Sequence, residues 1–161
     1  SQGVIFVEMA ALTNDSTSRR ITLYGNSSER IVISYGVSSN RIECAILGSN
    51  GSGVTTVLFT TNYQITNINK IAYKWSLDGI ELWVNGIMVD SALSSAIPNI
   101  LNDIRFDDGS GGNKFYGKLK NLQVYPTALT DEELLLLTGL PNETYYDSYL
   151  AMSQNLTYTI K

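Results

Sequence analysis

The chain has 161 residues, enough for one domain with its own core, and its formal net charge is −4. Lysines and arginines are scattered singly, which excludes an electrostatic footprint for nucleic acid and a polybasic membrane patch. There is no histidine, so the usual general base and the commonest metal ligand are missing, and the single cysteine, Cys44, excludes an internal disulfide. No apolar run is long enough to predict membrane insertion.

Short segments of alternating apolar and polar residues predict a succession of β-strands. In chain order they are expected at residues 3–9, 20–24, 30–36, 41–47 and 54–60, in three strands within 70–90, and at 102–106 and 115–125. One helix is predicted after the last strand, because Thr130 and Glu133 form a capping box, and Gly139 is a suitable stop. The pattern predicts an all-β protein, an antiparallel two-sheet β-sandwich with one short C-terminal helix.

The chain is expected to divide at its last glycine. Residues 1–139 are predicted to form the sandwich. Residues 140–161 are predicted to form an extension, with a short helix near 147–154 and a strand near 156–160, that docks on the sandwich or leads into a next domain.

Two hairpin signals lie back to back, at Asp78-Gly79 and at Asn85-Gly86. If each dipeptide is the turn, Trp83 lies opposite Lys74 on one side and Met88 on the other. One predicted face is apolar and holds Tyr73, Trp75, Leu82, Val84, Ile87 and Val89. The other face holds Lys74, Ser76, Glu81, Trp83, Met88 and Asp90, so that one large aromatic residue lies on a mostly polar surface.

Several motifs resemble a known family. They are G-x-x-F-x-E from Gly3, K-I-A from Lys70, L-W-V-N-G from Leu82, and F-Y-G-K-L-K-N-L-Q-V-Y from Phe115 followed by A-L-T-D-E-E-L. These motifs are similar to the laminin G-like, concanavalin A-like jelly roll, in particular to modules of bacteriophage tail and fibre proteins. The resemblance implies a sandwich whose relatives mostly bind glycans and often hold a structural calcium. It also implies a location in a virion or outside the cell, and no signal peptide is expected within this sequence.

Candidate ligand-binding residues follow from this face assignment. Trp83 could stack on a sugar ring, with Lys74, Glu81 and Met88 at its edge; the alternative is that the C-terminal segment or a crossing loop covers it. Further stacking candidates, for which core or rim is the alternative, are Tyr35, Tyr63 and Tyr116. Arg41, like Arg19 and Arg20, could bind the carboxylate of a uronic or sialic acid, and a solvated surface charge is the alternative.

The loop from Asp107 to Asn113 is rich in acidic residues and glycine. Asp107, Asp108 and Asn113 could hold calcium, which prefers oxygen ligands, but the loop lacks the spacing of an EF-hand. The alternative is a flexible hairpin loop, and no other cofactor is predicted.

The sequence argues against catalysis, because it lacks the E-x-D-x-x-E run of jelly-roll glycosidases and the histidine of many lyases. We therefore predict a non-catalytic carbohydrate-binding module with an oligo- or polysaccharide partner, in a phage tail or fibre. One alternative is a structural or oligomerisation domain, which would join chains as a homo-oligomer through a parent fibre protein. A polysaccharide lyase or glycosidase is the remote alternative.

Overall fold

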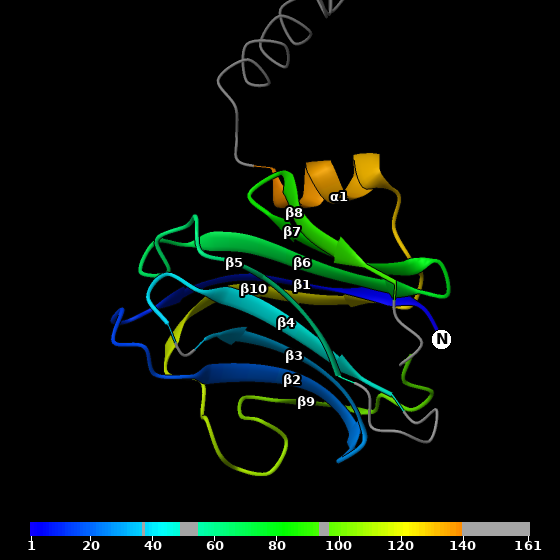
Figure 1. Ribbon diagram of the computed structural model, residues 1–161, viewed down its shortest axis with the longest axis horizontal. Coiled ribbons are helices and arrows are strands. Elements are labelled where there is room, and N and C mark those ends of the chain that lie inside the picture. The colour runs from blue at the N-terminus through cyan, green and yellow to red at the C-terminus, as the bar shows by residue number, and fades with distance from the viewer. Residues whose placement is uncertain (37, 49–54, 94–96, 140–161) are drawn as a thin grey trace, which may run out of the picture.

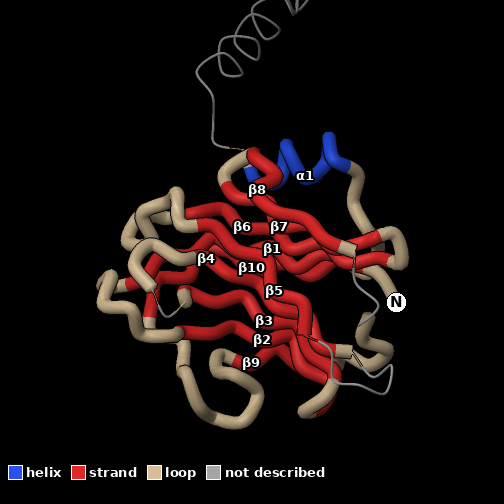
Figure 2. Tube along the Cα trace, in the orientation of Figure 1, coloured by secondary structure: helices blue, strands red, loops and turns tan. Residues whose placement is uncertain are grey.

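The computed structural model describes residues 1–36, 38–48, 55–93 and 97–139, and shows a β-sandwich (Figure 1). All strands pair antiparallel in two five-stranded sheets (Figure 2). Sheet A has the order β10-β1-β6-β7-β8, with β1 Gly3–Ala11, β6 Asn69–Ser76, β7 Gly79–Val84, β8 Ile87–Ala92 and β10 Gly117–Tyr125. Sheet B has the order β5-β4-β3-β2-β9, with β2 Arg19–Asn26, β3 Glu29–Tyr35, β4 Ile42–Leu47, β5 Thr55–Thr60 and β9 Asp103–Arg105. The predicted fold class is confirmed.

The core lies between the inner faces of the two sheets. Alternate residues of each strand point into it, such as Ile31, Ile33 and Tyr35 of β3. Cys44 lies in the same core, and its burial raises the pKa of the thiol well above its usual value. Cys44 is therefore a small apolar residue of the core.

The helix α1, Asp131–Thr138, packs on the outer face of sheet A, on the side away from sheet B (Figure 1). The capping box is present: the Thr130 hydroxyl accepts from the Glu133 N–H at 3.3 Å, and the Glu133 carboxylate accepts from the Thr130 N–H at 2.8 Å. Gly139 follows the helix as expected, but at a φ of −56° rather than in the left-handed region. Residues of β1, β6, β7 and α1 form a second cluster of Val4, Phe6, Ala72, Trp83 and Leu134.

The hairpin between β7 and β8 has the predicted turn, with φ of 52° at Asn85 and 84° at Gly86. The β6–β7 register is different, because Ser76 pairs with Gly79 and the turn is Leu77-Asp78. This shift by two residues preserves the assignment of faces, since side chains alternate with a period of two. It places Lys74 opposite Glu81 and not opposite Trp83.

A β-bulge in β8 corrects one further expectation. Trp83 pairs with Met88, but Leu82 pairs with Asp90, so one extra residue is inserted in β8. The insertion moves Asp90 off the predicted polar face, and its carboxylate accepts from the Phe59 N–H of β5 at 3.0 Å. Asp90 thereby links the edge strands of the two sheets.

The predicted helix and strand in residues 140–161 fall outside the described residues. None of the described helices is long and apolar enough to cross a membrane.

Candidate functional site

Trp83 is buried, with 7% of its surface exposed, under Leu134 of α1. Its indole N–H donates to the Glu81 carboxylate at 2.9 Å. The structure therefore corrects the idea of an open sugar platform, because no ring face is free for stacking. The alternative, a covered face, is the one observed, and α1 provides the cover.

The predicted neighbours of Trp83 lie closer to the surface. The Lys74 ammonium lies 2.9 Å from the Glu81 carboxylate and 3.4 Å from that of Asp131. Burial alone would lower the pKa of Lys74, but hydrogen bonds to these carboxylates raise it above its usual value. Met88 is 46% exposed on β8.

The three candidate tyrosines have different environments. Tyr35 is fully buried, its hydroxyl donates to the Met9 carbonyl at 2.7 Å, and burial raises its pKa well above the usual value. Tyr63 packs against the core and donates to the Val84 carbonyl at 3.3 Å. Tyr35 and Tyr63 therefore have structural roles, whereas Tyr116 is 64% exposed and remains available for contact.

In the 107–113 loop, the acidic side chains bind the loop itself. Asp108 accepts from the backbone N–H groups of Ser110 and Gly112 at 2.9 and 3.0 Å, and Asn113 donates its side-chain amide to Asp108 at 3.1 Å. Asp107 accepts from the Gly109 N–H at 2.6 Å. These donors lower the pKa of Asp108, the Ser110 hydroxyl most of all.

Within the described ranges, no group of three or more His, Cys, Asp or Glu is placed to hold a metal. Calcium binding stays a prediction.

The outer face of sheet B contains a hollow of about 310 Å³, which we call the arginine hollow. Its floor includes Val32 of β3 and Ala45 of β4, which pair directly. Side chains from β2, from the same two strands and from the residue before β4 surround this floor, namely Arg20, Arg30, Ser34, Glu43 and Arg41. The strand pairing explains the arrangement, because Ser34 lies opposite both Arg20 and Glu43.

Arg41 and Glu43 are held in place by several contacts. Their side chains lie 2.7 Å apart, and the Ser34 hydroxyl donates to the second oxygen of Glu43 at 3.0 Å. The Arg41 guanidinium also lies over the Phe59 ring, 3.9 Å from its centroid. This side of the arginine hollow is therefore ordered before any ligand binds.

Arg20 and Arg30 have donors to spare. Arg20 donates to the Ser18 hydroxyl at 3.2 Å and has no carboxylate partner among the described residues. Arg30 donates to the Asp108 carbonyl at 3.1 Å, but its buried Nε has no partner in the described part of the chain. A buried donor without a partner carries a free-energy cost.

The sequence analysis identified Arg41 and Arg20 but missed Arg30, Ser34 and Glu43. The missed signal lay in β3, where assigning Ile31, Ile33 and Tyr35 to the core places Arg30 and Ser34 on the opposite face. Pairing β3 with β4 would then have added Glu43.

Comparison with known proteins supports the fold. No known family matches the sequence, and no curated protein sequence is similar to it. Solved structures do match. The CBM40 of the Ruminococcus gnavus IT-sialidase, solved bound to alpha2,3 sialyllactose, has a TM-score of 0.68 and 18% identity over 86% of this chain and 83% of that one.

Two further structures belong to larger proteins. The leech intramolecular trans-sialidase has a TM-score of 0.68 and 18% identity, over 88% of this chain but only 24% of that one. The receptor-binding domain of botulinum neurotoxin type G has a TM-score of 0.61 and 14% identity, over 91% of this chain and 38% of that one. At these identities the likeness defines the class, a jelly-roll β-sandwich. The jelly-roll part of the family resemblance is confirmed, while its laminin G-like and phage parts stay predictions.

Proposed function

We propose that this chain is a non-catalytic carbohydrate-binding module that binds an acidic sugar in the arginine hollow. The observation that carries the proposal is the composition of that hollow, three arginines and one glutamate around an apolar floor. A guanidinium presents a planar fork of donors that matches a carboxylate, such as that of a sialic or uronic acid. The arginine hollow is thus positively charged in a chain whose net charge is −4.

The other groups of the arginine hollow suit the rest of a sugar. Val32 and Ala45 offer an apolar floor for C–H or methyl groups, and Phe59, which is 45% exposed, extends it beside Arg41. The Glu43 carboxylate accepts hydrogen bonds from hydroxyl or amide groups. The sialyllactose complex of the R. gnavus module supports a saccharide partner for this fold.

The number of carboxylates in the arginine hollow agrees with a site that binds a sugar without cleaving it. Glycosidases use two carboxylates on either side of the scissile bond, whereas the arginine hollow has Glu43 alone. Glu43 is also committed to Arg41 and Ser34.

We propose that the module is part of a phage tail or fibre protein, and this part of the proposal rests on the sequence resemblance alone. A shallow hollow gives weak binding per site, so several copies in a fibre would raise the avidity for a polysaccharide surface.

Calorimetric titration with sialyllactose and with a glucuronate-containing disaccharide tests the proposal. We expect Arg20→Ala and Arg30→Ala each to weaken binding about tenfold or more, because a charge-assisted hydrogen bond contributes about 1.5–3 kcal/mol. Arg20→Lys should recover only part of the affinity, because it keeps the charge but loses the fork.

The matched control is Lys118→Ala on the edge strand β10, which removes a surface cation away from the hollow and should bind as the wild type does. The proposal is overturned if no acidic glycan binds, or if folded Arg20→Ala and Arg30→Ala variants bind as tightly as the wild type. A stable trimer by light scattering with no glycan signal would instead support the structural alternative.

A further inference from the structure

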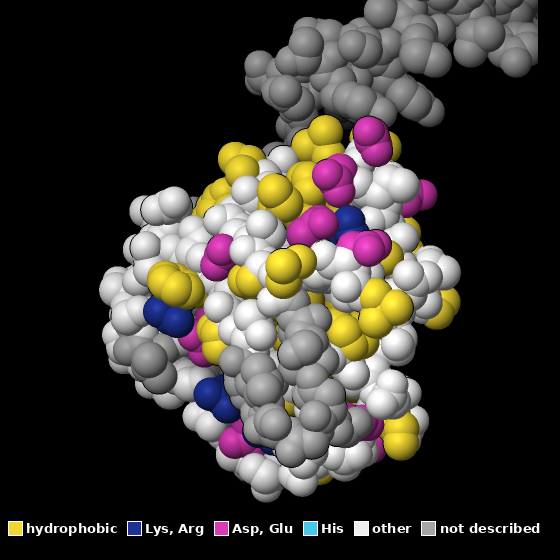
Figure 3. Space-filling model, turned by 45° about the vertical axis from the view of Figure 1, so that its right-hand side comes forward, with side chains coloured by type: hydrophobic (Ala, Val, Ile, Leu, Met, Phe, Trp, Pro, Cys, Tyr) yellow, Lys and Arg dark blue, Asp and Glu magenta, His cyan; other side chains and the backbone are white. Residues whose placement is uncertain are grey.

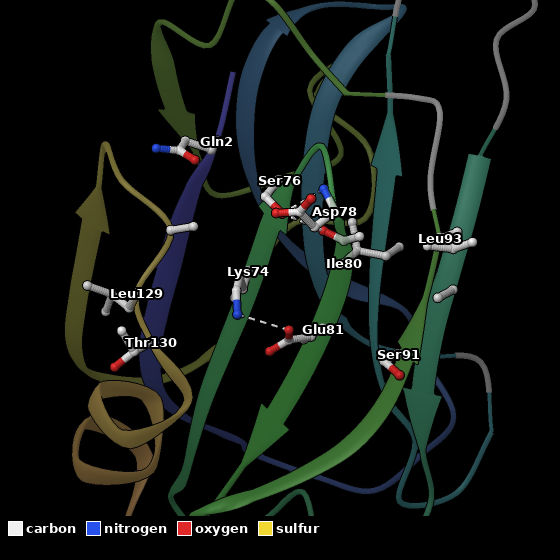
Figure 4. A pocket seen from close by; sticks show the side chains of 13 residues that line it. Gln2, Lys74, Ser76, Asp78, Ile80, Glu81, Ser91, Leu93, Leu129 and Thr130 are labelled. Atoms are coloured by element: carbon white, nitrogen blue, oxygen red, sulfur yellow. Dashed lines mark hydrogen bonds and ion pairs between the residues drawn. The ribbon is translucent and has the colours of Figure 1, made fainter.

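A larger hollow, of about 650 Å³, lies on the outer face of sheet A next to α1; we call it the sheet A hollow. Figure 4 shows Lys74 and Glu81 in its middle, Leu129 and Thr130 on one side, and Ser91 and Leu93 on the other. Its volume falls within the range of about 300–1,000 Å³ that small-molecule sites occupy.

The sheet A hollow begins where α1 ends its cover of the sheet. Ala72 and Trp83 pair with each other under α1. The next outward-facing pair along the same strands is Lys74 with Glu81, and Ser91 lies opposite Glu81 on β8. The polar neighbours of Trp83 therefore remain accessible although Trp83 itself is buried.

The polar groups of the sheet A hollow are held in fixed positions. One Glu81 oxygen accepts from Lys74 and the other from the Trp83 indole, each at 2.9 Å. A carboxylate has about four lone-pair sites, so Glu81 retains acceptors for hydroxyl groups. The Ser76 hydroxyl is anchored by the Asp78 N–H at 3.1 Å. These anchored groups lose little conformational entropy when a ligand binds.

The charge of the sheet A hollow differs from that of the arginine hollow. The Lys74 charge is neutralised by Glu81 at 2.9 Å and approached by Asp131 at 3.4 Å, and Asp78 adds another negative charge to the lining. Figure 3 shows acidic side chains gathered around α1 with a basic one between them. Such a surface repels a carboxylate ligand and suits an uncharged one with many hydroxyl groups.

We infer that the sheet A hollow is a second saccharide site, specific for neutral sugars. Leu129 and Leu93 provide apolar walls, and Glu81, Ser76 and Ser91 provide hydrogen-bonding groups between them. The two hollows lie on the outer faces of opposite sheets, so one module would hold an acidic and a neutral sugar at the same time. The second site is independent of the arginine hollow.

Titration of the ¹⁵N-labelled protein with lactose, maltose and cellobiose, followed by NMR, tests the inference. We expect at least one of these sugars to cause saturable shifts of the Ser76, Glu81 and Ser91 amides. Ser91→Trp, at an exposed position of β8, should fill the hollow and weaken that binding at least about tenfold, whereas Ser28→Trp, in the exposed β2–β3 turn, should not.

The Arg20→Ala variant separates this result from the first proposal. It should retain the full response to the neutral sugar while its affinity for sialyllactose falls about tenfold or more. A response to a neutral sugar would stand even if no acidic glycan bound. The inference is wrong if none of the three sugars gives saturable shifts, or if the shifts persist in a folded Ser91→Trp variant.

Discussion

The side chain of Trp83 links the second core to the sheet A hollow. One of its faces packs under α1, and its indole N–H holds the Glu81 carboxylate that the proposed neutral-sugar site uses. A residue that resembled a ligand platform in the sequence thus acts as a positioning residue. Its contribution to stability should exceed its contribution to any glycan contact.

Trp83→Ala should lower the free energy of unfolding by about 3–5 kcal/mol, because it leaves a cavity beneath α1. Urea denaturation measures this change. Met88→Ala, at the exposed position opposite Trp83, is the control and should cost far less. If Trp83→Ala left stability unchanged but abolished glycan binding, Trp83 would be a ligand contact after all.

At the scale of the element, α1 is short and depends on its neighbours. An isolated helix of this length is unstable in water, so its order comes from Leu134, which is fully buried, and from its capping box. Leu135 and Leu136 of the same helix are 50% and 61% exposed. The position of α1 nevertheless decides which part of sheet A is covered and which part is open.

Thr130→Ala should lower the free energy of unfolding by about 1 kcal/mol, because the Glu133 N–H loses its acceptor. Thr130→Ser keeps the hydroxyl and should restore most of that loss. Thermal or urea denaturation of the three proteins measures the differences. Equal stability of the Ala and Ser variants would show that the capping box contributes nothing.

At the scale of the whole molecule, the absence of histidine sets the response to pH. The carboxyl of Asp15 has a lowered pKa because its oxygens accept from Arg19 at 2.8 Å, and that of Asp108 is lowered by its loop donors. A group whose folded pKa lies below its unfolded value stabilises the fold above the unfolded pKa, and that contribution is lost as the pH falls through the folded one.

The melting temperature should therefore change little between about pH 6 and 8, where histidine would titrate, and fall below about pH 4. Melting curves across this range, recorded at constant ionic strength, test the expectation. Asp108→Asn should make the melting temperature fall less steeply at acid pH, because it removes one of the two carboxyl groups with a lowered pKa to which we attribute that fall. A large change of melting temperature near neutral pH would contradict the expectation that carboxyl groups alone cause the pH dependence of stability.

The elements, the Asn85-Gly86 turn and the Thr130 cap followed from the sequence alone, because alternation, turn preference and capping are local properties of neighbouring residues. Only the tertiary structure decided that α1 covers Trp83, that β6 pairs two residues away from the expected register, and that Arg20, Arg30 and Arg41 surround one hollow. These features depend on contacts between segments far apart in the chain. Several pairings satisfy the same pattern of faces, and close packing of the whole sandwich selects one of them.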